Sequence, residues 1–370
     1  MLMLEELKKL NIKENLADEL KRQNLPLVMW GAGEIAEEVN FYLKKNDIKL
    51  DDVFVDNEYY SENVLFDGKM VLSASMLREK YKVVNVILGC SNYERIKSIE
   101  KLAFVNKVFY LFSYTYGLYE KTPLDEIKEN IDEFEKINGI FADDLSSQNY
   151  LAFLKTRVSG NNSYVFDLFK RESNYFNNDI FKADAKEVLM DIGAFDGDTI
   201  RLFLKESGGH YKHVYALEPD KVNREMLEKY VHKNALQNVT IAGEIPWKEE
   251  GELHFVTNEN GQLSSLVFNE NGRAEGVGKG IRAKQLDEMF QYTENITLIK
   301  INYLEGVKEA LQGAENILKI HKPKLAISVG FDCNNIRSVP MIIKEINPDY
   351  KLYLRYNRAT VSALTCYGII

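Results

Sequence analysis

Leucines recur at helical spacing in the first 23 residues of the chain. Because positions three or four apart share one face of a helix, this spacing predicts one amphipathic helix over residues 3–23, ended by Pro26. The leucines are Leu4, Leu7, Leu10, Leu16 and Leu20.

A short apolar run, a glycine turn and a helix follow one another after this first helix. The run covers residues 27–30, the turn reads Gly31-x-Gly33-x-x-Ala36, and the helical pattern continues to Lys45. Further apolar runs predict strands at 53–56, 84–88 and 107–111, the first of which ends in Asp56. A strand, a glycine turn and a helix open a doubly wound α/β unit, so we predict a Rossmann-like N-terminal domain over residues 1–115.

The same order of elements begins again near residue 187. A strand at 187–191 leads into Gly193 and Gly197 and a helix to Lys205, and the next strand, 213–218, ends in Glu218. A helix is expected at 223–233, and further apolar runs predict strands at 239–242, 252–257, 298–302, 325–329 and 350–356. The alternation of strands and helices predicts a second, mostly parallel, doubly wound domain over residues 183–370, so the fold class is α/β.

Residues 116–182 separate the two predicted domains. Their first part, 120–145, is strongly acidic and helical in pattern, and we interpret it as a solvated helix that joins the domains. Residues 143–182 are rich in Asn, Ser, Tyr and Phe and predict short helices that pack against the second domain. We therefore expect a helical connector.

Composition narrows the classes of partner. A chain of 370 residues with 45% hydrophobic positions has room for two or three cored domains. Its formal net charge of −9 argues against broad binding of nucleic acid or of an anionic membrane. The three cysteines form no CxxC pair, and no signal peptide or membrane-spanning run is apparent. We expect a cytoplasmic protein with no metal, nucleic-acid or membrane partner, and leave a homo-oligomer open.

The second glycine turn carries an acidic residue before its first glycine, as Asp191-x-Gly193-x-x-x-Gly197. An anion at that point repels a pyrophosphate but suits the ammonium of S-adenosylmethionine, directly or through water, so it favours this cofactor over NAD. Glu218 is expected to bind the ribose diol, and the run to Asp220 to border the adenine. The candidate cofactor-binding residues are Asp191, Gly193, Ala194, Phe195, Gly197, Asp198, Thr199, Glu218, Pro219 and Asp220.

In the first domain, Gly31, Gly33 and Asp56 form a nucleotide-type fingerprint, which is compatible with a nucleotide or nucleotide-sugar ligand. The same turn also serves helix–strand packing without any ligand. Both interpretations remain open from the sequence.

Several stretches of the second half resemble the FkbM-type methyltransferases. They are residues 175–180, 191–199, 215–220, 285–288, 311–314 and 322–328. The likeness spans about residues 140–370, and the first domain looks like the Rossmann-like module that precedes some members. The resemblance implies a class I methyltransferase fold, S-adenosylmethionine as methyl donor, and a hydroxyl acceptor on a sugar, glycan or small metabolite.

The chain departs from the family on the acceptor side. Where members read Lys-x-Asp-x-Glu-Gly, this chain has Asn302 and Leu304 after Lys300, and only a slipped register brings Glu305 to the glutamate position. The family's Tyr-His becomes Gly330-Phe331, and its later Arg-His becomes Arg355-Tyr356. These replacements have two alternative explanations: the acceptor has changed, or catalysis has been lost.

The leading hypothesis is an S-adenosylmethionine-dependent O-methyltransferase, and the alternative is a catalytically silent S-adenosylmethionine-binding protein. An NAD-dependent sugar-modifying enzyme ranks last, because the first domain has no Tyr-x-x-x-Lys after a suitable strand. Asn302 stands at the expected catalytic position, although a carboxamide cannot act as a base, and Glu305 and Asp332 are weaker candidates. Candidate substrate contacts are Ser264, Ser265, Tyr303, Phe331 and Tyr356.

Overall fold

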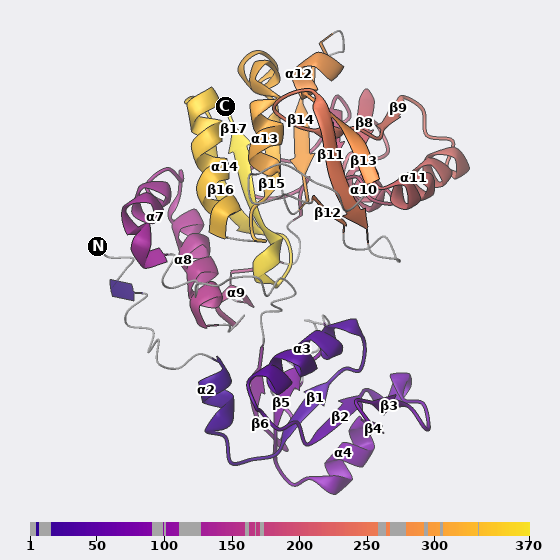
Figure 1. Cartoon of the computed structure of the whole chain (residues 1–370), viewed down its shortest axis with the longest axis vertical. Helices are drawn as coiled ribbons and strands as arrows, with labels where there is room; N and C mark the ends of the chain where they lie inside the picture. Colours follow the sequence, from indigo (N-terminus) through magenta and orange to yellow (C-terminus); the bar gives the residue numbers. More distant parts are fainter. Residues whose placement is uncertain are drawn as a thin grey trace. The chain divides into compact units, whose positions relative to one another are not determined.

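The computed structural model of the chain shows two compact units (Figure 1). The first takes Met1–Ile131, Leu151–Leu168 and Ala359–Val361, and the second takes Asp132–Tyr150, Phe169–Arg358 and Ser362–Ile370. The structure describes residues 5–6, 16–90, 99, 101–110, 127–159, 163–166, 168–170, 174–257, 264–266, 279–291, 295–303, 306–331 and 333–370.

The first unit is built on a six-stranded sheet in the order β3-β4-β2-β1-β5-β6. Neighbouring strands pair in parallel, except in the β3–β4 hairpin. Every residue of β1 and of β5 is buried, as expected for central strands of a parallel sheet. The strands are β1 (Leu27–Trp30), β2 (Asp52–Val55), β3 (Leu65–Phe66), β4 (Lys69–Ser73), β5 (Val84–Leu88) and β6 (Val105–Phe109).

Helices cover both faces of this sheet. Helix α3 packs Val39 and Leu43 against Met29 on one face, and helix α4 packs Leu77 against the opposite face. The unit is therefore doubly wound, as predicted. The helices are α2 (Leu16–Lys21), α3 (Glu34–Lys45), a 3-10 helix at Asn57–Tyr59, α4 (Ala74–Lys80) and α9 (Ser163–Phe166).

The second unit contains a seven-stranded sheet in the order β16-β17-β15-β14-β7-β8-β9. Its pairs are parallel from β9 through β15, and β17 runs antiparallel to both β15 and β16. The strands are β7 (Val188–Ile192), β8 (His213–Leu217), β9 (Val239–Ala242), β14 (Leu298–Ile301), β15 (Lys324–Ser328), β16 (Lys351–Tyr356) and β17 (Leu364–Ile369).

Two helix pairs pack beside this sheet. Helices α10 and α11 bury Ile200, Phe203 and Leu227 against Leu189 and Ala216. Helices α13 and α14 lie side by side in Figure 1, and α14 contacts β17. The helices that lie wholly or partly in the second unit are α7 (Ile131–Asn138), α8 (Asp144–Ser159), α10 (Asp198–Glu206), α11 (Lys221–Lys233), α12 (Leu286–Met289), α13 (Val307–Gln312), a π-helix at Ile317–His321, α14 (Cys333–Ile346) and a 3-10 helix at Val361–Ala363.

A separate four-stranded sheet interrupts the predicted alternation of strands and helices between β9 and β14. Its order is β10-β13-β11-β12, and β11 pairs antiparallel with both β12 and β13. The sequence predicts only the run 252–257 here, within the main sheet. The difference arises because an isolated short strand pattern does not reveal its pairing partner. The strands are β10 (Ile245–Pro246), β11 (Gly251–Thr257), β12 (Ser264–Leu266) and β13 (Lys279–Lys284).

The connector region also differs from the prediction. Instead of one acidic helix, α7 ends at Asn138 and α8 begins at Asp144, because the Asp143 carboxylate accepts the backbone N–H of Ser146 at 2.8 Å and caps α8. The connector is shared between the two compact units: the second unit includes residues 132–150 and 169–182, and the first includes residues 151–168. Residues 111–126 and most of the predicted helix 3–23 lie outside the described residues.

The edge strand β16 is covered by residues 142–149 of this connector. The backbone N–H of Ala142 donates to Leu352 at 2.8 Å, and the backbone N–H of Leu354 donates to Ser146 Oγ at 2.9 Å. The Asn149 side chain donates to the carbonyl of Leu354 at 2.8 Å. Backbone groups that an edge strand would otherwise expose are thus satisfied. Among the described residues, no helix is long and apolar enough to cross a membrane.

Candidate functional site

The carboxyl edge of the second sheet brings the predicted cofactor residues together. Strand β7 has β8 on one side and β14 on the other, so the chain changes direction across the sheet beside β7. Ligands of open α/β sheets bind at such a switch point, outside the carboxyl ends of the strands. The turn at Gly193 follows β7, Glu218 follows β8, and Asn302 follows β14.

Gly193 is required by the backbone around it. Its φ is +75°, and a Cβ there would lie 2.5 Å from the carbonyl oxygen of Asn302. The backbone N–H groups of Gly193 and Ala194 both donate to the carbonyl of Leu217, at 3.0 and 3.1 Å. The turn is therefore fixed between the ends of β8 and β14, and this packing alone accounts for the first glycine of the motif.

Glu218 holds the neighbouring loops with both of its carboxylate oxygens. Oε2 accepts the backbone N–H of Phe195 at 2.8 Å, and Oε1 accepts that of Asp220 at 2.9 Å. Each oxygen keeps one lone pair for a further donor, such as a hydroxyl. Phe195 itself has a φ of +49°, a left-handed conformation that costs a non-glycine residue about 1 kcal/mol or more and clusters at functional sites.

The pKa of the Glu218 carboxyl is unusually high. The residue is only 6% exposed. Burial raises its pKa to about 7, even though the two backbone donors act to lower it. A carboxyl that titrates near neutral pH at a sheet switch point is typical of a functional group.

Of the two forms of the role predicted for Asp191, direct and water-mediated, its surroundings fit the water-mediated one. Its side chain is fully buried, and Oδ1 pairs with the Nζ of Lys300 at 2.8 Å, so it does not face a ligand directly. The Nζ of Lys300 also donates to the carbonyl of Gly193 at 2.9 Å. Asp191 Oδ2 is buried without a hydrogen-bond partner among the described residues, which is a place for a bound water.

The rest of the motif serves helix packing and capping. Gly197, with a φ of +88°, lets α10 approach α11, where a Cβ would lie 3.0 Å from Leu227. Asp198 accepts the backbone N–H of Thr199 at 2.7 Å in the first turn of α10. Asp220 caps α11 by accepting the N–H of Asn223 at 2.9 Å. Pro219 lies beside it, in the loop whose carbonyls bond to Arg224.

On the acceptor side, the predicted residues differ in burial and in their contacts. Asn302 is half-buried at the end of β14. Tyr303 follows it and donates its hydroxyl to the carbonyl of Gly306 at 3.3 Å, and Phe331 lies beyond the end of β15. Tyr356 is 1% exposed, with its hydroxyl on the carbonyl of Asn149 at 3.3 Å, so it is a core residue and not a surface contact.

Ser264 and Ser265 lie on β12, at the edge of the small sheet. Leu304, Glu305 and Asp332 fall outside the described residues. Within the described part of the chain, no three His, Cys, Asp or Glu residues group as metal ligands would.

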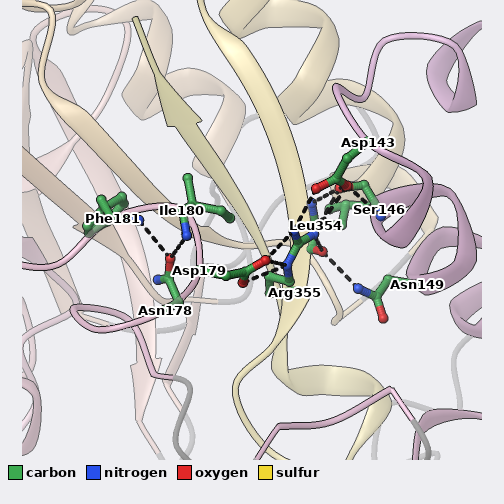
Figure 2. A network of polar contacts seen from close by, with 9 residues as sticks. All are labelled: Asp143, Ser146, Asn149, Asn178, Asp179, Ile180, Phe181, Leu354 and Arg355. Atoms are coloured by element: carbon green, nitrogen blue, oxygen red, sulfur yellow. Dashed lines mark hydrogen bonds and ion pairs between the residues drawn. The ribbon is translucent and has the colours of Figure 1, made fainter.

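Arg355, where the family carries the arginine of its Arg-His pair, is a structural tie (Figure 2). It is 5% exposed and bonds to Asp143 at 2.6 Å and to Asp179 at 2.7 Å. It also donates to the hydroxyl of Ser146 at 3.1 Å. Arg355 therefore joins the start of α8 and the loop around Asp179 to the end of β16.

The sequence interpretation assigned no role to two polar groups at this edge. Lys300 is the only charge in the buried run of β14, and a lone charge in an apolar strand, opposite Asp191 in the next strand, is the signal that could have identified the pair. The other is the hydroxyl of Tyr175, which lies 3.1 Å from Ser328 Oγ at the end of β15. Only three-dimensional contact reveals the second pair.

The first unit repeats the backbone geometry of the second. Gly31, with a φ of +116°, would place a Cβ 2.4 Å from the carbonyl oxygen of Gly89 at the end of β5. Gly33 begins α3, and a Cβ there would meet nothing within 4 Å. Asp56 follows β2 at the same edge. The packing of Gly31 needs no ligand, and the nucleotide site in this unit remains a prediction.

Comparisons with known proteins place the fold. Residues 191–349 match the family model of the methyltransferase FkbM domain. The solved structure of methyltransferase FkbM from Methylobacillus flagellatus KT is similar over 99% of this chain and 98% of its own, with a TM-score of 0.71 and 18% identity. At that identity the likeness shows the fold, and it confirms the predicted class I methyltransferase fold of the second unit.

Two further solved structures overlap the chain less closely, at a TM-score of 0.32 each. One is a putative methyltransferase from Streptococcus mutans in complex with SAH, 16% identical over 50% of this chain and 90% of its own. The other is precorrin-6y C5,15-methyltransferase from Geobacter metallireducens GS-15, 10% identical over 55% of this chain and 94% of its own. None of the curated proteins matches the chain significantly.

Proposed function

We propose that the chain is an S-adenosylmethionine-dependent methyltransferase acting on a hydroxyl group of a sugar, glycan or small metabolite, and the match of residues 191–349 to the family model of the methyltransferase FkbM domain supports this. The observation that carries the proposal is Glu218, a buried carboxylate after the second strand whose oxygens are oriented by the N–H groups of Phe195 and Asp220. A carboxylate at that place is suited to accept both hydroxyls of a ribose.

The residues at this edge fit the cofactor. Each oxygen of Glu218 keeps a lone pair for a ribose hydroxyl, and Asp191 Oδ2 offers an unused buried acceptor for a bridging water. When bound, S-adenosylmethionine supplies a methyl group on a sulfonium. The chain itself has to bind the nucleoside half through Glu218, orient the acceptor oxygen in line, and exclude water.

Asn302 stands where a strand delivers a side chain to the acceptor. Its carboxamide can donate and accept hydrogen bonds and so orient a hydroxyl group, but it cannot remove a proton. This observation keeps the second candidate function in view, a protein that binds S-adenosylmethionine without transferring its methyl group.

The pH dependence of cofactor binding tests the role of Glu218. Because the ionised carboxylate accepts two ribose hydroxyls, we expect the affinity for S-adenosylmethionine to rise between pH 6 and 8 with a midpoint near the Glu218 pKa of about 7. Calorimetric titration across this range measures it. Glu218→Gln has no ionisable group at this position, so its affinity should be flat over the same range; an equal rise in both proteins would contradict the assignment.

The Glu218 carboxyl also affects the stability of the protein without any ligand. Its folded pKa lies above the unfolded value, so the protonated form stabilises the fold and the free energy of unfolding falls as pH rises from about 4.5 to 7. At about 1.4 kcal/mol per pKa unit, the fall due to Glu218 amounts to about 3 kcal/mol. Chemical denaturation of wild type and Glu218→Gln should differ by that slope.

The variant Asn302→Asp tests whether the chain is a methyltransferase with a changed acceptor or one that has lost catalysis. If the missing base limits turnover, this variant should raise methyl transfer by about 100-fold or more, since a positioned base contributes about 10²–10⁴-fold. The measurement is transfer of labelled methyl from S-adenosylmethionine to a panel of methyl glycosides. Asn234→Asp, at the exposed end of α11, is the matched control. No gain on a glycoside that wild type already methylates would contradict a role for the lost carboxylate.

A further inference from the structure

Lys300 is a buried cation in the middle of the sheet. Its side chain has no exposed surface, and its Nζ donates to Asp191 Oδ1 at 2.8 Å and to the carbonyl of Gly193 at 2.9 Å. A buried ion pair gives little net stability over well-packed apolar residues of similar size. The fold alone therefore does not explain a lysine in the apolar strand β14.

The bond to Gly193 completes the fixation of the glycine turn. On the β8 side, the turn's N–H groups at Gly193 and Ala194 are held by the carbonyl of Leu217, and the N–H of Phe195 is held by Glu218. On the β14 side, the Gly193 carbonyl is held by Lys300. The lysine thus fixes the Gly193–Ala194 peptide, which directly precedes the peptide whose N–H, on Phe195, donates to Glu218.

The charge of Lys300 acts on the same carboxylate. Burial lowers the pKa of Lys300, but Asp191 outweighs this and keeps it above the ordinary value, with Tyr175 and Asp198 adding to the rise. Burial likewise raises the pKa of Glu218, Asp220 raises it further, and the positive charge of Lys300 acts against both. Lys300 therefore favours the ionised form of Glu218.

We propose that Lys300 is a positioning residue of the methyl-donor site, which fixes the turn at Gly193 for the ribose-binding carboxylate of Glu218. This inference rests on the proposed function. Lys300 does not touch the ligand in it; it acts through Gly193 and Phe195, and Asp191 serves to make the buried cation tolerable.

The test compares Lys300→Met alone with the double variant Lys300→Met/Asp191→Asn. The single variant leaves a buried carboxylate without a partner and is expected to be the less stable of the two, whereas the double variant removes both charges and is expected to unfold near the wild-type denaturant midpoint. S-adenosylhomocysteine is the probe. Its affinity for the double variant should fall about 10- to 100-fold, the effect of one charge-assisted hydrogen bond, and the pH midpoint of binding should move up.

Lys324→Met is the matched control. Lys324 pairs with the buried Glu187 at 2.5 Å, at the amino ends of β15 and β7, away from the glycine turn. Its loss should lower stability and leave the affinity for S-adenosylhomocysteine and its pH midpoint unchanged. Lys300→Gln keeps an N–H donor and loses the charge. It is expected to raise the pH midpoint of S-adenosylhomocysteine binding, which gives a second test of the charge effect.

Wild-type affinity and an unchanged midpoint in the double variant and in Lys300→Gln would overturn the inference and leave the proposed function standing. Absence of binding by the wild type would overturn both.

Discussion

Arg355→Met is expected to lower the free energy of unfolding by about 2–4 kcal/mol, because it removes the one cation shared by Asp143 and Asp179 in the network of Figure 2. Breaking a fully buried pair costs about 3–5 kcal/mol, and the two carboxylates here are partly exposed, so the lower range applies. Methionine keeps much of the side-chain volume. Chemical denaturation at pH 7 measures the change.

The dependence of the free energy of unfolding on pH below about 4 shows whether the ion pairs of Arg355 cause this stabilisation. Burial acts to raise the pKa of Asp143, but hydrogen bonds from Arg355 and Ser146 outweigh it and lower the pKa to about 2; the pKa of Asp179 is also lowered, chiefly by Arg355. The stabilisation is therefore present above the unfolded pKa and is lost as pH falls from about 4 toward 2. Arg355→Met should lose this dependence.

Arg282→Met is the control for Arg355→Met, since Arg282 pairs with Glu250 where both side chains are more than half exposed. A surface pair of this kind contributes about 0–1 kcal/mol. Equal destabilisation by the two substitutions, or an unchanged dependence of stability on acidic pH in Arg355→Met, would contradict the role of Arg355 as a tie.

Glu218→Ala is expected to weaken S-adenosylmethionine binding by about 100-fold or more. Two hydroxyl groups lose a charged acceptor, at about 1.5–3 kcal/mol for each bond, and the N–H groups of Phe195 and Asp220 lose their partner. Calorimetry at pH 8, where the wild-type carboxylate is mostly ionised, gives the largest contrast. Glu225→Ala, a half-exposed residue on α11 paired with Lys221, should bind as wild type does; a similar loss in both would contradict a local role for Glu218.

The sequence predicts the strands and turns that build both switch points. Continuous apolar runs such as 27–30 and 84–88 mark buried parallel strands, and β1 and β5 have those bounds. Glycines directly after a run mark the turns, and Gly31 and Gly193 prove to occupy equivalent places, each against the carbonyl that ends a neighbouring strand. These features are local, so a pattern read along the chain can find them.

The features that the sequence does not predict are those that depend on pairing between distant segments of the chain. The small sheet depends on β11 finding β13, Arg355 depends on two loops more than 170 positions away, and the burial of Tyr356 depends on α8 covering β16. The motif that predicts Asp191 beside the ligand is local, whereas the ion pair of Asp191 with Lys300 joins residues 109 positions apart along the chain and is not visible in that motif. Register and tertiary packing, which set these contacts, leave little trace in spacing.

Calorimetric titration of the full chain with S-adenosylhomocysteine, with NAD as the comparison, tests the central claim most directly. We expect saturable binding of one molecule per chain, lost in Glu218→Ala and not reproduced by NAD at the same site. Absence of saturable binding, or binding that Glu218→Ala leaves unchanged, would contradict a methyl-donor site at the turn after β7.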